Sequence, residues 1–293
     1  MFFAGFLLAL NIFAWKEVFV LSSDRNLKVV FFDVGQGDSA FIETPEGHQI
    51  IIDGGPDSSL LQKLNERMPF WDRTIDLVIL THPEKDHMTG LIDLLEQYKI
   101  DYFLWTGIIK NSPQSKKLSE LLEKAQSQDK NYFLASLAEF KPTKIIFAEP
   151  DSDLSAGDVY IDILSPLENL SGQEVQNTND SSVVVKLIYG ENEFIFTGDI
   201  GFSIEKKLVS AGIDLSADVL KVAHHGSKYS TSDKFLAVAS PEVAVISAGK
   251  NNSYGHPTPE VLQRLADFGI ETLRTDQKGD IIILSDGNKI YIK

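Results

Sequence analysis

The sequence contains no cysteine. This absence excludes disulfide bonds, a catalytic thiolate and cysteine-ligated zinc together. Any metal ion bound by this chain must therefore be held by histidine, aspartate or glutamate. The absence leaves the compartment open, because a cysteine-free domain can fold on either side of a membrane.

Basic charge is also scarce. The chain has 27 Lys and Arg against 42 Asp and Glu, and its formal net charge is −15. Proteins that bind nucleic acid nonspecifically normally have a basic surface, so this balance argues against that class. It argues less against a metalloenzyme, because divalent ions bring positive charge to the one place where a phosphate would dock.

Long hydrophobic runs are missing except near the N-terminus. Residues 2–15 are apolar apart from Asn11, and Lys16 ends the run. The run is shorter than the about 20 residues of a membrane-spanning helix, and it lacks the basic start and cleavage site of a signal peptide. We expect residues 1–22 to be a hydrophobic anchor or signal-like segment, with packing on the domain as the alternative. An anchor predicts a membrane-attached or secreted protein whose domain is extracytoplasmic, although Lys16 and Arg25 favour the opposite topology.

The remaining chain alternates between strand-like and helical patterns without a Pro- or Ser-rich linker. Strands grouped with helices, twice over, predict an α/β (α+β) fold in which two mixed sheets pack face to face with helices outside. We expect residues 27–292 to form this single domain. The expected strands are 28–33, 39–44, 49–53, 76–80, 143–147, 158–164, 182–189, 193–197, 219–223, 243–247, 271–275, 280–284 and 289–292. The expected helices are 58–67, 88–98, 111–131, 204–211, 231–239 and 259–268.

The strongest chemical signal is the segment T-H-P-E-K-D-H at residues 81–87, directly after a buried strand-like run. It contains His82, Glu84, Asp86 and His87. A lone histidine is more often a hydrogen-bonded structural residue. Two histidines and two carboxylates at a strand end predict a metal-binding cluster instead.

Histidines elsewhere in the chain follow the same placement. Of the six histidines, all but His48 lie in short motifs after strand-like runs, including His224, His225 and His256. Asp199 also ends such a run, in a position suited to bridging two metal ions. Scattered structural histidines would not be expected to gather at strand ends in this way.

Three further aspartates follow early strands. Asp53 could orient a ligand histidine through a hydrogen bond. Turn chemistry is the simpler explanation for Asp53, as it is for Asp33 and Asp38.

The order of Asp53, the H-x-E-x-D-H motif at 82–87, Asp199 and His225 resembles the metallo-β-lactamase superfamily. The resemblance covers about residues 27–292. It implies an αββα sandwich that binds one or two divalent metal ions between its sheets, and a hydrolase that uses a metal-bound hydroxide.

Three other motifs resemble the hydrolase domain of ComEC-type DNA-uptake (competence) proteins and their stand-alone relatives. They are F-D-V-G-Q-G-D-S at 32–39, H-H-G-S at 224–227 and Y-G-H-P at 254–257. This closer resemblance implies DNA or another phosphodiester as the substrate.

The sequence departs from the superfamily pattern at two places. Glu84 stands where the superfamily commonly has a third histidine, and residues 177–182 lack the usual mid-chain histidine. One metal position is therefore expected to be rich in oxygen ligands, so manganese or magnesium would compete there with zinc. We expect activity with manganese to exceed activity with zinc.

The resemblance implies a role for each candidate residue. The first ion would be held by Asp86, His87 and His225, the second by His82 with Glu84 or Asp180, and Asp199 would bridge them. Asp86, His256 and Ser227 are the candidate catalytic residues.

His256 would contact the scissile phosphate or protonate the leaving group, and Ser227 would donate a hydrogen bond to a phosphate oxygen. We expect His225 and not His224 to be the ligand, because His225 precedes Gly226 and Ser227 as the superfamily's late histidine does. Successive residues of a strand also point to opposite faces.

Three functions follow from these observations. The first is a phosphodiesterase or nuclease acting on DNA, and the second is a hydrolase of another small ester or phosphodiester in the same site. The third is a degenerate metal-binding module without catalysis, suggested by Glu84 and the absent histidine. The acidic net charge of −15 favours smaller substrates over long DNA.

Overall fold

The structure is a computed structural model that describes residues 26–127, 141–150 and 152–293. The segment expected to be an anchor, residues 1–22, lies outside the described residues. In the described part of the chain, no helix combines the length and the apolar character needed to cross a bilayer.

Two mixed sheets form the centre of the molecule. The first is 8-stranded, with the order β15-β14-β1-β2-β3-β4-β5-β6, and the second is 7-stranded, with the order β13-β12-β11-β10-β9-β8-β7. The first sheet consists of β1 (Leu27–Phe31), β2 (Ala40–Glu43), β3 (Gln49–Ile52), β4 (Thr74–Ile79), β5 (Lys99–Trp105), β6 (Lys144–Phe147), β14 (Ile281–Ser285) and β15 (Ile290–Ile292). The second consists of β7 (Leu154–Ala156), β8 (Val159–Ser165), β9 (Val184–Tyr189), β10 (Asn192–Phe196), β11 (Val219–Lys221), β12 (Val243–Ile246) and β13 (Glu271–Arg274).

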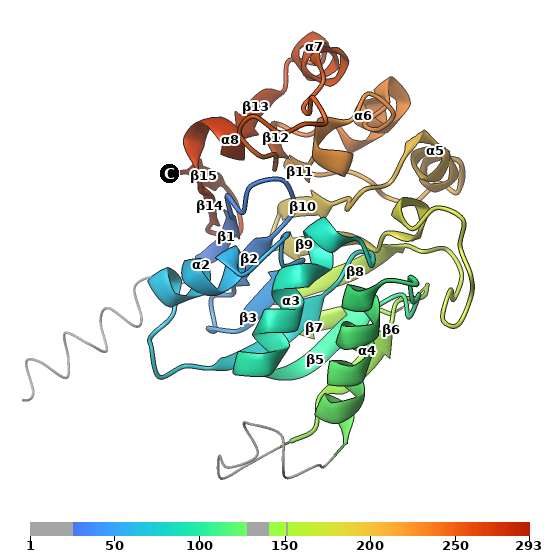
Figure 1. Ribbon diagram of the computed structural model, residues 1–293. Helices are drawn as coiled ribbons and strands as arrows, with labels where there is room; N and C mark the ends of the chain where they lie inside the picture. The colour runs from blue at the N-terminus through green and yellow to red at the C-terminus, as the bar shows by residue number, and fades with distance from the viewer. Residues whose placement is uncertain (1–25, 128–140, 151) are drawn as a thin grey trace, which may run out of the picture.

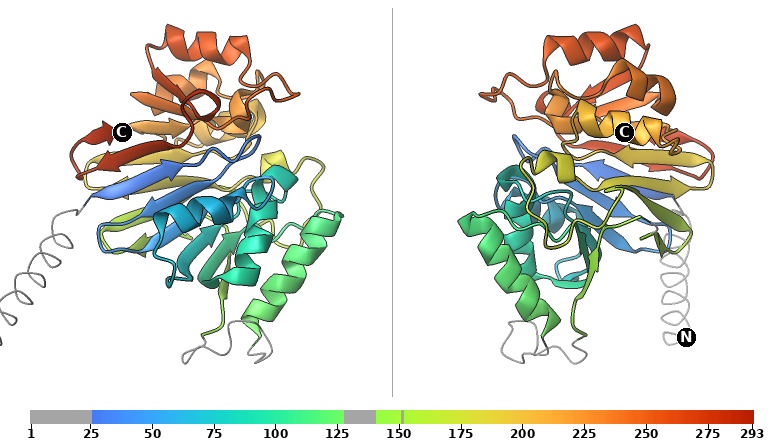
Figure 2. Two further views of the ribbon diagram at one scale, coloured as in Figure 1. Left: turned by 60° about the vertical axis from the view of Figure 1, so that its left-hand side comes forward. Right: turned by 90° about the vertical axis from the view of Figure 1, so that its right-hand side faces the viewer.

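Helices cover the outer faces of both sheets (Figures 1 and 2). The first sheet is covered by α2 (Ser59–Arg67), α3 (Lys85–Gln97) and α4 (Pro113–Gln126). The second is covered by α5 (Phe202–Ser210), α6 (Asp233–Ala239) and α7 (Pro259–Asp267), and the short α8 (Thr275–Lys278) follows β13. The 3₁₀ turns are η1 (Asn179–Ser181) and η2 (Ala223–Gly226). The expected sandwich of two mixed sheets with helices outside is confirmed.

The alternation of side chains along β1 explains why its sequence is apolar from Val29 to Phe31. Val29 and Phe31 join the core between the two sheets, whereas Val30 and Phe32 join the core between the first sheet and its helices. The Phe31 ring stacks on that of Phe196 from the second sheet, with centroids 5.6 Å apart. A strand buried on both faces reads as a continuous apolar run, and such strands hold the layers together.

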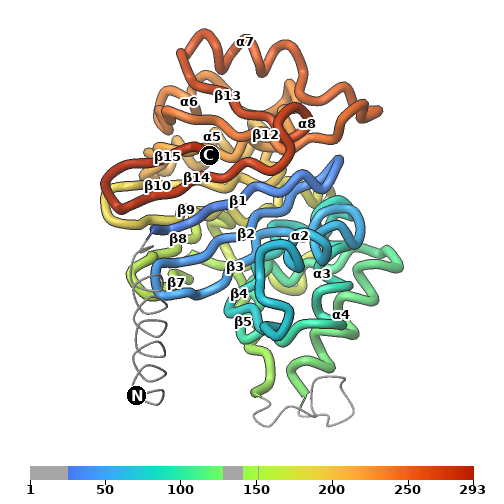
Figure 3. The backbone as a smooth tube through the Cα atoms, turned by 90° about the vertical axis from the view of Figure 1, so that its left-hand side faces the viewer, coloured from blue at the N-terminus to red at the C-terminus, as the bar shows by residue number. Residues whose placement is uncertain are grey.

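The first and last described strands belong to the same sheet. β1 pairs antiparallel with β14, with Leu27 opposite Ser285, and the two lie side by side in Figure 3. The two halves of the described chain therefore do not form separate modules, because the last hairpin completes the sheet begun by β1.

The structure departs from the expected elements in a few places. β5 was not expected: α3 ends at Gln97 and the strand begins at Lys99, without a Gly or Pro to mark the boundary. The helix expected over 111–131 spans Pro113–Gln126, and residues 128–131 lie outside the described part. The strand expected over 219–223 ends at Lys221, where the backbone turns into η2.

Candidate metal centre

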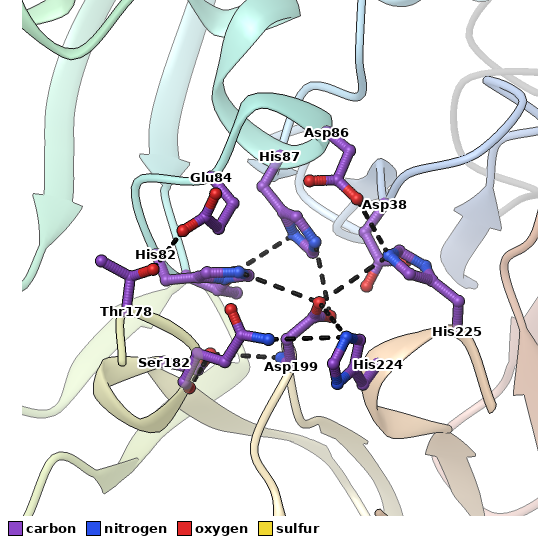
Figure 4. A network of polar contacts seen from close by, with 12 residues as sticks. Asp38, His82, Glu84, Asp86, His87, Thr178, Ser182, Asp199, His224 and His225 are labelled. Carbon is purple, nitrogen blue, oxygen red and sulfur yellow. Dashed lines mark hydrogen bonds and ion pairs between the residues drawn. The ribbon is translucent and has the colours of Figure 1, made fainter. Parts of the chain in front are cut away.

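The candidate residues meet because they follow strands that end at the same edge of the sandwich (Figure 4). Asp53 and His82 follow β3 and β4, which are parallel neighbours in the first sheet. Asp199 and His225 follow β10 and β11, which are parallel neighbours in the second. The carboxyl ends of parallel strands lie on one side of a sheet, so packing the two sheets brings both sets of loops together.

His87, in the first turn of α3, lies between two carboxylates. Its Nδ1 is 2.7 Å from Asp53 Oδ2 and its Nε2 is 3.3 Å from Asp199 Oδ1. Neutral imidazole carries a single ring proton, which the short contact with Asp53 places on Nδ1. The Nε2 lone pair then points toward Asp199, and a cation between these two atoms would satisfy both.

His225 has the same arrangement in the second sheet. Its Nδ1 lies 3.0 Å from the carbonyl oxygen of Ser247, an acceptor that fixes the proton on that nitrogen. Its Nε2 lies 3.3 Å from Asp86 Oδ2 and 3.8 Å from Asp199 Oδ2. The free lone pair again faces carboxylate oxygens.

Thr81 orients the third histidine. Its hydroxyl donates to Asp53 Oδ2 at 2.7 Å and can therefore only accept from Nδ1 of His82, at 3.0 Å. The Nε2 of His82 is left facing Asp199 Oδ2 at 3.9 Å. All three histidines thus carry a proton on Nδ1 and direct Nε2 toward the same place.

The unpaired atoms at this place fit a divalent ion. His82 Nε2, His87 Nε2 and Asp199 Oδ1 are buried without a hydrogen-bond partner among the described residues, and buried polar atoms are rarely left in that state. Ligand atoms of His82, His87 and Asp199 lie within 4.8 Å of one another, and so do those of Asp86, His87 and His225. Nitrogen and carboxylate donors gathered in this way suit a divalent metal ion.

The electrostatics of the pocket also favour a cation. Burial lowers the pKa of His87, but the charges of Asp199 and Asp53 outweigh burial and raise it well above the usual value. Burial also lowers the pKa of His225, but the charges of Asp199 and Asp38 outweigh burial and raise this pKa to about 10. Burial and the neighbouring charge of His87 lower the pKa of His82 to about 3. Without a metal ion, the carboxylates therefore attract protons to two of the three imidazoles.

Two of the predicted ligands lie apart from these groups. Both Glu84 carboxylate oxygens are 2.6 Å from Lys110 Nζ, and one also accepts from the Thr178 hydroxyl. Asp180 accepts a hydrogen bond from Ser203 at 3.3 Å. Among the described residues, neither belongs to a metal-ligand group. Their side chains are engaged by residues distant in the sequence, which the sequence pattern does not reveal.

The predicted contact of Ser227 with substrate is not supported by its position. Ser227 is buried, its hydroxyl accepts a hydrogen bond from the Tyr229 N–H, and it does not line the pocket over the metal centre. Ser227 directly follows η2, and its side chain is buried in the protein.

A pocket of about 170 Å³ opens over the metal centre. His256 lines it, with its ring 5.6 Å from that of His224 and its Nδ1 buried without a partner in the described chain. The lining residues are Gln36, Glu84, Asp86, Asn179, Asp199, His224, His225, Tyr254 and His256. His256 is therefore placed to reach a substrate that occupies the pocket.

The argument from strand alternation for His224 and His225 is wrong. Both residues lie in η2, beyond the end of β11, and both have left-handed backbone angles, with φ of 51° and 53°. Their side chains nevertheless take different positions. His225 is buried, whereas His224 lines the pocket with its Nε2 3.8 Å from Asp199 Oδ2.

Several residues of the site carried no clear sequence signal. Asp53 hydrogen-bonds Nδ1 of His87, in agreement with the prediction that it could orient a ligand histidine. Asp38, explained by turn chemistry in the sequence, is instead buried beside His225. Turn chemistry does hold for Asp33, which accepts a hydrogen bond from the Gly35 N–H. A lysine in an apolar strand, as at Lys221, was an available signal, because a buried lysine requires a partner.

The comparisons with known proteins agree with this geometry. The sequence profile of the Metallo-beta-lactamase superfamily matches residues 32–250. ComE operon protein 3 of Bacillus subtilis is 32% identical over 278 residues, which cover 89% of this chain and 33% of that protein. Competence protein ComA of Neisseria gonorrhoeae is 28% identical over 260 residues, covering 87% of this chain and 32% of that protein.

The chain thus spans about a third of the length of these relatives. Among solved structures, the metallo-beta-lactamase fold protein YhfI from Bacillus subtilis has a TM-score of 0.55 at 13% identity. That similarity covers 88% of this chain and 100% of YhfI, and it concerns the fold alone.

Proposed function

The chain belongs to the metallo-beta-lactamase superfamily, whose fold is that of metal-dependent hydrolases, and on this premise we propose that it is a phosphodiesterase or nuclease that acts on DNA. The relatives named for competence support a DNA-related substrate. This chain spans about a third of the length of those proteins, so DNA hydrolysis is a proposal for this chain.

The observation that supports catalysis is the convergence of unpaired ligand atoms. The Nε2 atoms of His82 and His87 meet Asp199 Oδ1 at a buried place below an open pocket. A divalent ion bound there would polarise a phosphoryl oxygen and lower the pKa of a coordinated water toward neutrality. A degenerate module would not be expected to keep each Nδ1 anchored while leaving the Nε2 atoms of His82 and His87 without a hydrogen-bond partner among the described residues.

The chain's own residues would perform the remaining tasks. Asp53, Thr81 and Ser247 orient the three histidines through the Nδ1 contacts described above. His256 reaches the pocket from a separate loop and is the candidate to contact the phosphate or protonate the leaving group. Burial and the neighbouring His224 lower the pKa of His256, which favours neutral imidazole at neutral pH. In that form His256 can donate a hydrogen bond to the phosphate, so this direction favours the contact over protonation of the leaving group.

A second candidate is hydrolysis of a small ester or phosphodiester in the same site. Glu84 and Asp86 line the pocket, and the net charge of −15 opposes the approach of a long polyanion. A small substrate would meet less of this repulsion than a DNA duplex does.

Hydrolysis assays on metal-depleted protein would test the proposal. The protein would be reloaded with manganese, zinc or magnesium, then given single-stranded DNA, duplex DNA and bis(p-nitrophenyl) phosphate. We expect metal-dependent cleavage of DNA, lost in Asp199→Asn. Cleavage of the small diester alone would favour the second candidate, and metal binding without any hydrolysis would favour the degenerate module.

We also propose that residues 1–22 attach the protein to a membrane with its domain on the extracytoplasmic side. The apolar composition of residues 2–15 supports attachment. Cell fractionation combined with protease accessibility would test it, and a wholly cytosolic full-length protein would rule it out.

A further inference from the structure

A buried ion pair joins the two sheets directly behind the metal centre. Lys221 Nζ lies 2.6 Å from Asp38 Oδ2, and both side chains are almost wholly buried. Asp38 lies in the loop between β1 and β2 of the first sheet, whereas Lys221 ends β11 of the second. The roles proposed above for the metal centre and the pocket use neither residue.

The other oxygen of Asp38 faces a metal-ligand candidate. Asp38 Oδ1 lies 3.2 Å from Nδ1 of His225, the ring nitrogen that faces away from Asp86. The Nδ1 hydrogen bond goes to the Ser247 carbonyl, and the Asp38 carboxylate lies beside the same nitrogen as an ion-pair partner. Because Nδ1 and Nε2 lie on different sides of the ring, Asp38 can stay beside Nδ1 while Nε2 takes a metal ion.

The loop that carries Asp38 is fitted closely to the metal centre. The Asp38 N–H donates to the Asp86 carbonyl at 3.2 Å. A Cβ at Gly37 would lie 2.3 Å from that carbonyl oxygen, and Gly37 has φ of +155°. Glycine is thus required for the approach, which explains part of the G-Q-G-D motif that the proposed chemistry leaves unused.

From this geometry we propose that Lys221 and Asp38 form a positioning pair that holds His225 in its metal-binding orientation. The negative charge of Asp38 beside Nδ1 reinforces the hydrogen bond of that nitrogen to Ser247, so that Nε2 is presented to the ion. Lys221 acts through Asp38, since a buried carboxylate that lost its cationic partner would turn away from this position. The pair does for His225 what Asp53 and Thr81 do for His87 and His82.

This inference rests on the proposed metal-dependent function, and its test separates the two. Metal-free full-length protein would be titrated with Co²⁺ alone, in competition with a chromophoric chelator, while the visible spectrum of the bound ion is recorded. We expect Lys221→Met and Asp38→Asn each to weaken Co²⁺ binding by about 10–100-fold and to change the spectrum. Since Lys221 acts through Asp38, the two substitutions should not add. The variant that carries both should bind Co²⁺ about as tightly as whichever single variant binds it more weakly.

Lys186 provides the matched control. It is also a buried lysine of the second sheet, with its side chain 2% exposed, and it pairs with Glu193 and Asp214. Lys186→Met should lower thermal stability without changing the affinity or the spectrum of Co²⁺. Lys221→Arg keeps the charge and should retain affinity within a few-fold, so the comparison stands even if Lys221→Met does not fold.

The outcomes are distinct. If Lys221→Met and Asp38→Asn lose only thermal stability, as Lys186→Met does, the pair is structural and the inference is wrong. If the wild-type chain binds no Co²⁺, the metal centre fails and the inference fails with it. Weaker Co²⁺ binding in Lys221→Met and Asp38→Asn, together with unchanged Co²⁺ binding in Lys186→Met, would support the positioning role of the pair.

Discussion

Each histidine of the metal centre has one ring nitrogen engaged by the protein and the other turned toward Asp199 or Asp86. The anchoring groups differ: Thr81 for His82, Asp53 for His87, and Ser247 with Asp38 for His225. A proton fixed on Nδ1 determines which nitrogen can bind an ion, so the anchors matter as much as the ligands.

Adjacent histidines in η2 should behave differently when replaced. We expect His225→Ala to lose bound metal and activity, because its Nε2 belongs to a ligand group. His224→Ala should keep the metal content and lose part of the turnover, because His224 lines the pocket and is 34% exposed. Elemental analysis and a hydrolysis assay on both variants would check this, and the reverse pattern would overturn the assignment.

Replacement of Glu84 should affect the binding of substrate and not the binding of metal. Because its carboxylate is engaged by Lys110 and Thr178, we expect Glu84→Gln to leave the metal content unchanged. Its position in the pocket lining predicts an effect on the KM of an anionic substrate instead. Loss of metal in Glu84→Gln, or a shift from manganese toward zinc preference in Glu84→His, would restore Glu84 as a ligand.

Helix α3 positions His87 through close packing on the turn after β3. The Gly54 N–H donates to the His87 carbonyl at 2.6 Å, and the Gly90 N–H donates to the Gly55 carbonyl at 3.2 Å. A Cβ at Gly90 would lie 2.0 Å from Gly54 O. The helix can therefore approach the Asp53 turn only because glycine stands on both sides of the contact.

Replacement of Gly90 should push helix α3 away from the turn that carries Asp53. Glycine to alanine in a helix interior normally stabilises by about 1 kcal/mol. Here the clash with backbone should outweigh that gain, since overpacking costs about 1–3 kcal/mol. We expect Gly90→Ala to lower the urea midpoint and to weaken metal binding by shifting His87 away from Asp53. Gln97→Ala, at the exposed end of the same helix, should change neither, and a stabilised Gly90→Ala protein would contradict the packing argument.

At the scale of the whole molecule, Asp280 links the two ends of the described chain. Its carboxylate pairs with Lys63 at 2.7 Å and Arg67 at 2.9 Å, and it accepts the Asp33 N–H at 2.9 Å. Burial raises the pKa of Asp280, but these hydrogen bonds outweigh burial and place it below the usual value.

A lowered folded-state pKa makes the Asp280 contribution depend on pH. The stability that it provides is present above the unfolded value of about 3.9, and it is lost as pH falls through the folded pKa. We expect Asp280→Asn to be less stable than wild type at pH 7, with the difference shrinking below about pH 4. Urea unfolding of both proteins at several pH values would measure this. A difference that grows on acidification would contradict this expectation.

The arrangement of layers and the segments that carry the ligands could be predicted from the sequence alone. β1 is apolar at successive positions because both of its faces are buried, and Met88, Leu91, Leu94 and Leu95 lie on one face of α3 because a helix repeats every 3.6 residues. The H-x-E-x-D-H segment at 82–87 stood out for a similar reason, since its chemistry lies within one short stretch. Strand burial, helix periodicity and a short ligand motif each depend on neighbouring residues, so the sequence pattern of one segment predicts them.

The partners of each polar side chain were decided only by tertiary structure. Lys221 meets Asp38 across 183 positions, and Glu84 meets Lys110 and Thr178 from two other loops. His224 and His225 have left-handed backbone angles in η2, beyond the end of β11, which strand alternation could not predict. A hydrogen bond in this site depends on how the two sheets stack and where each loop turns, so it is a property of the packed sandwich and not of any one segment.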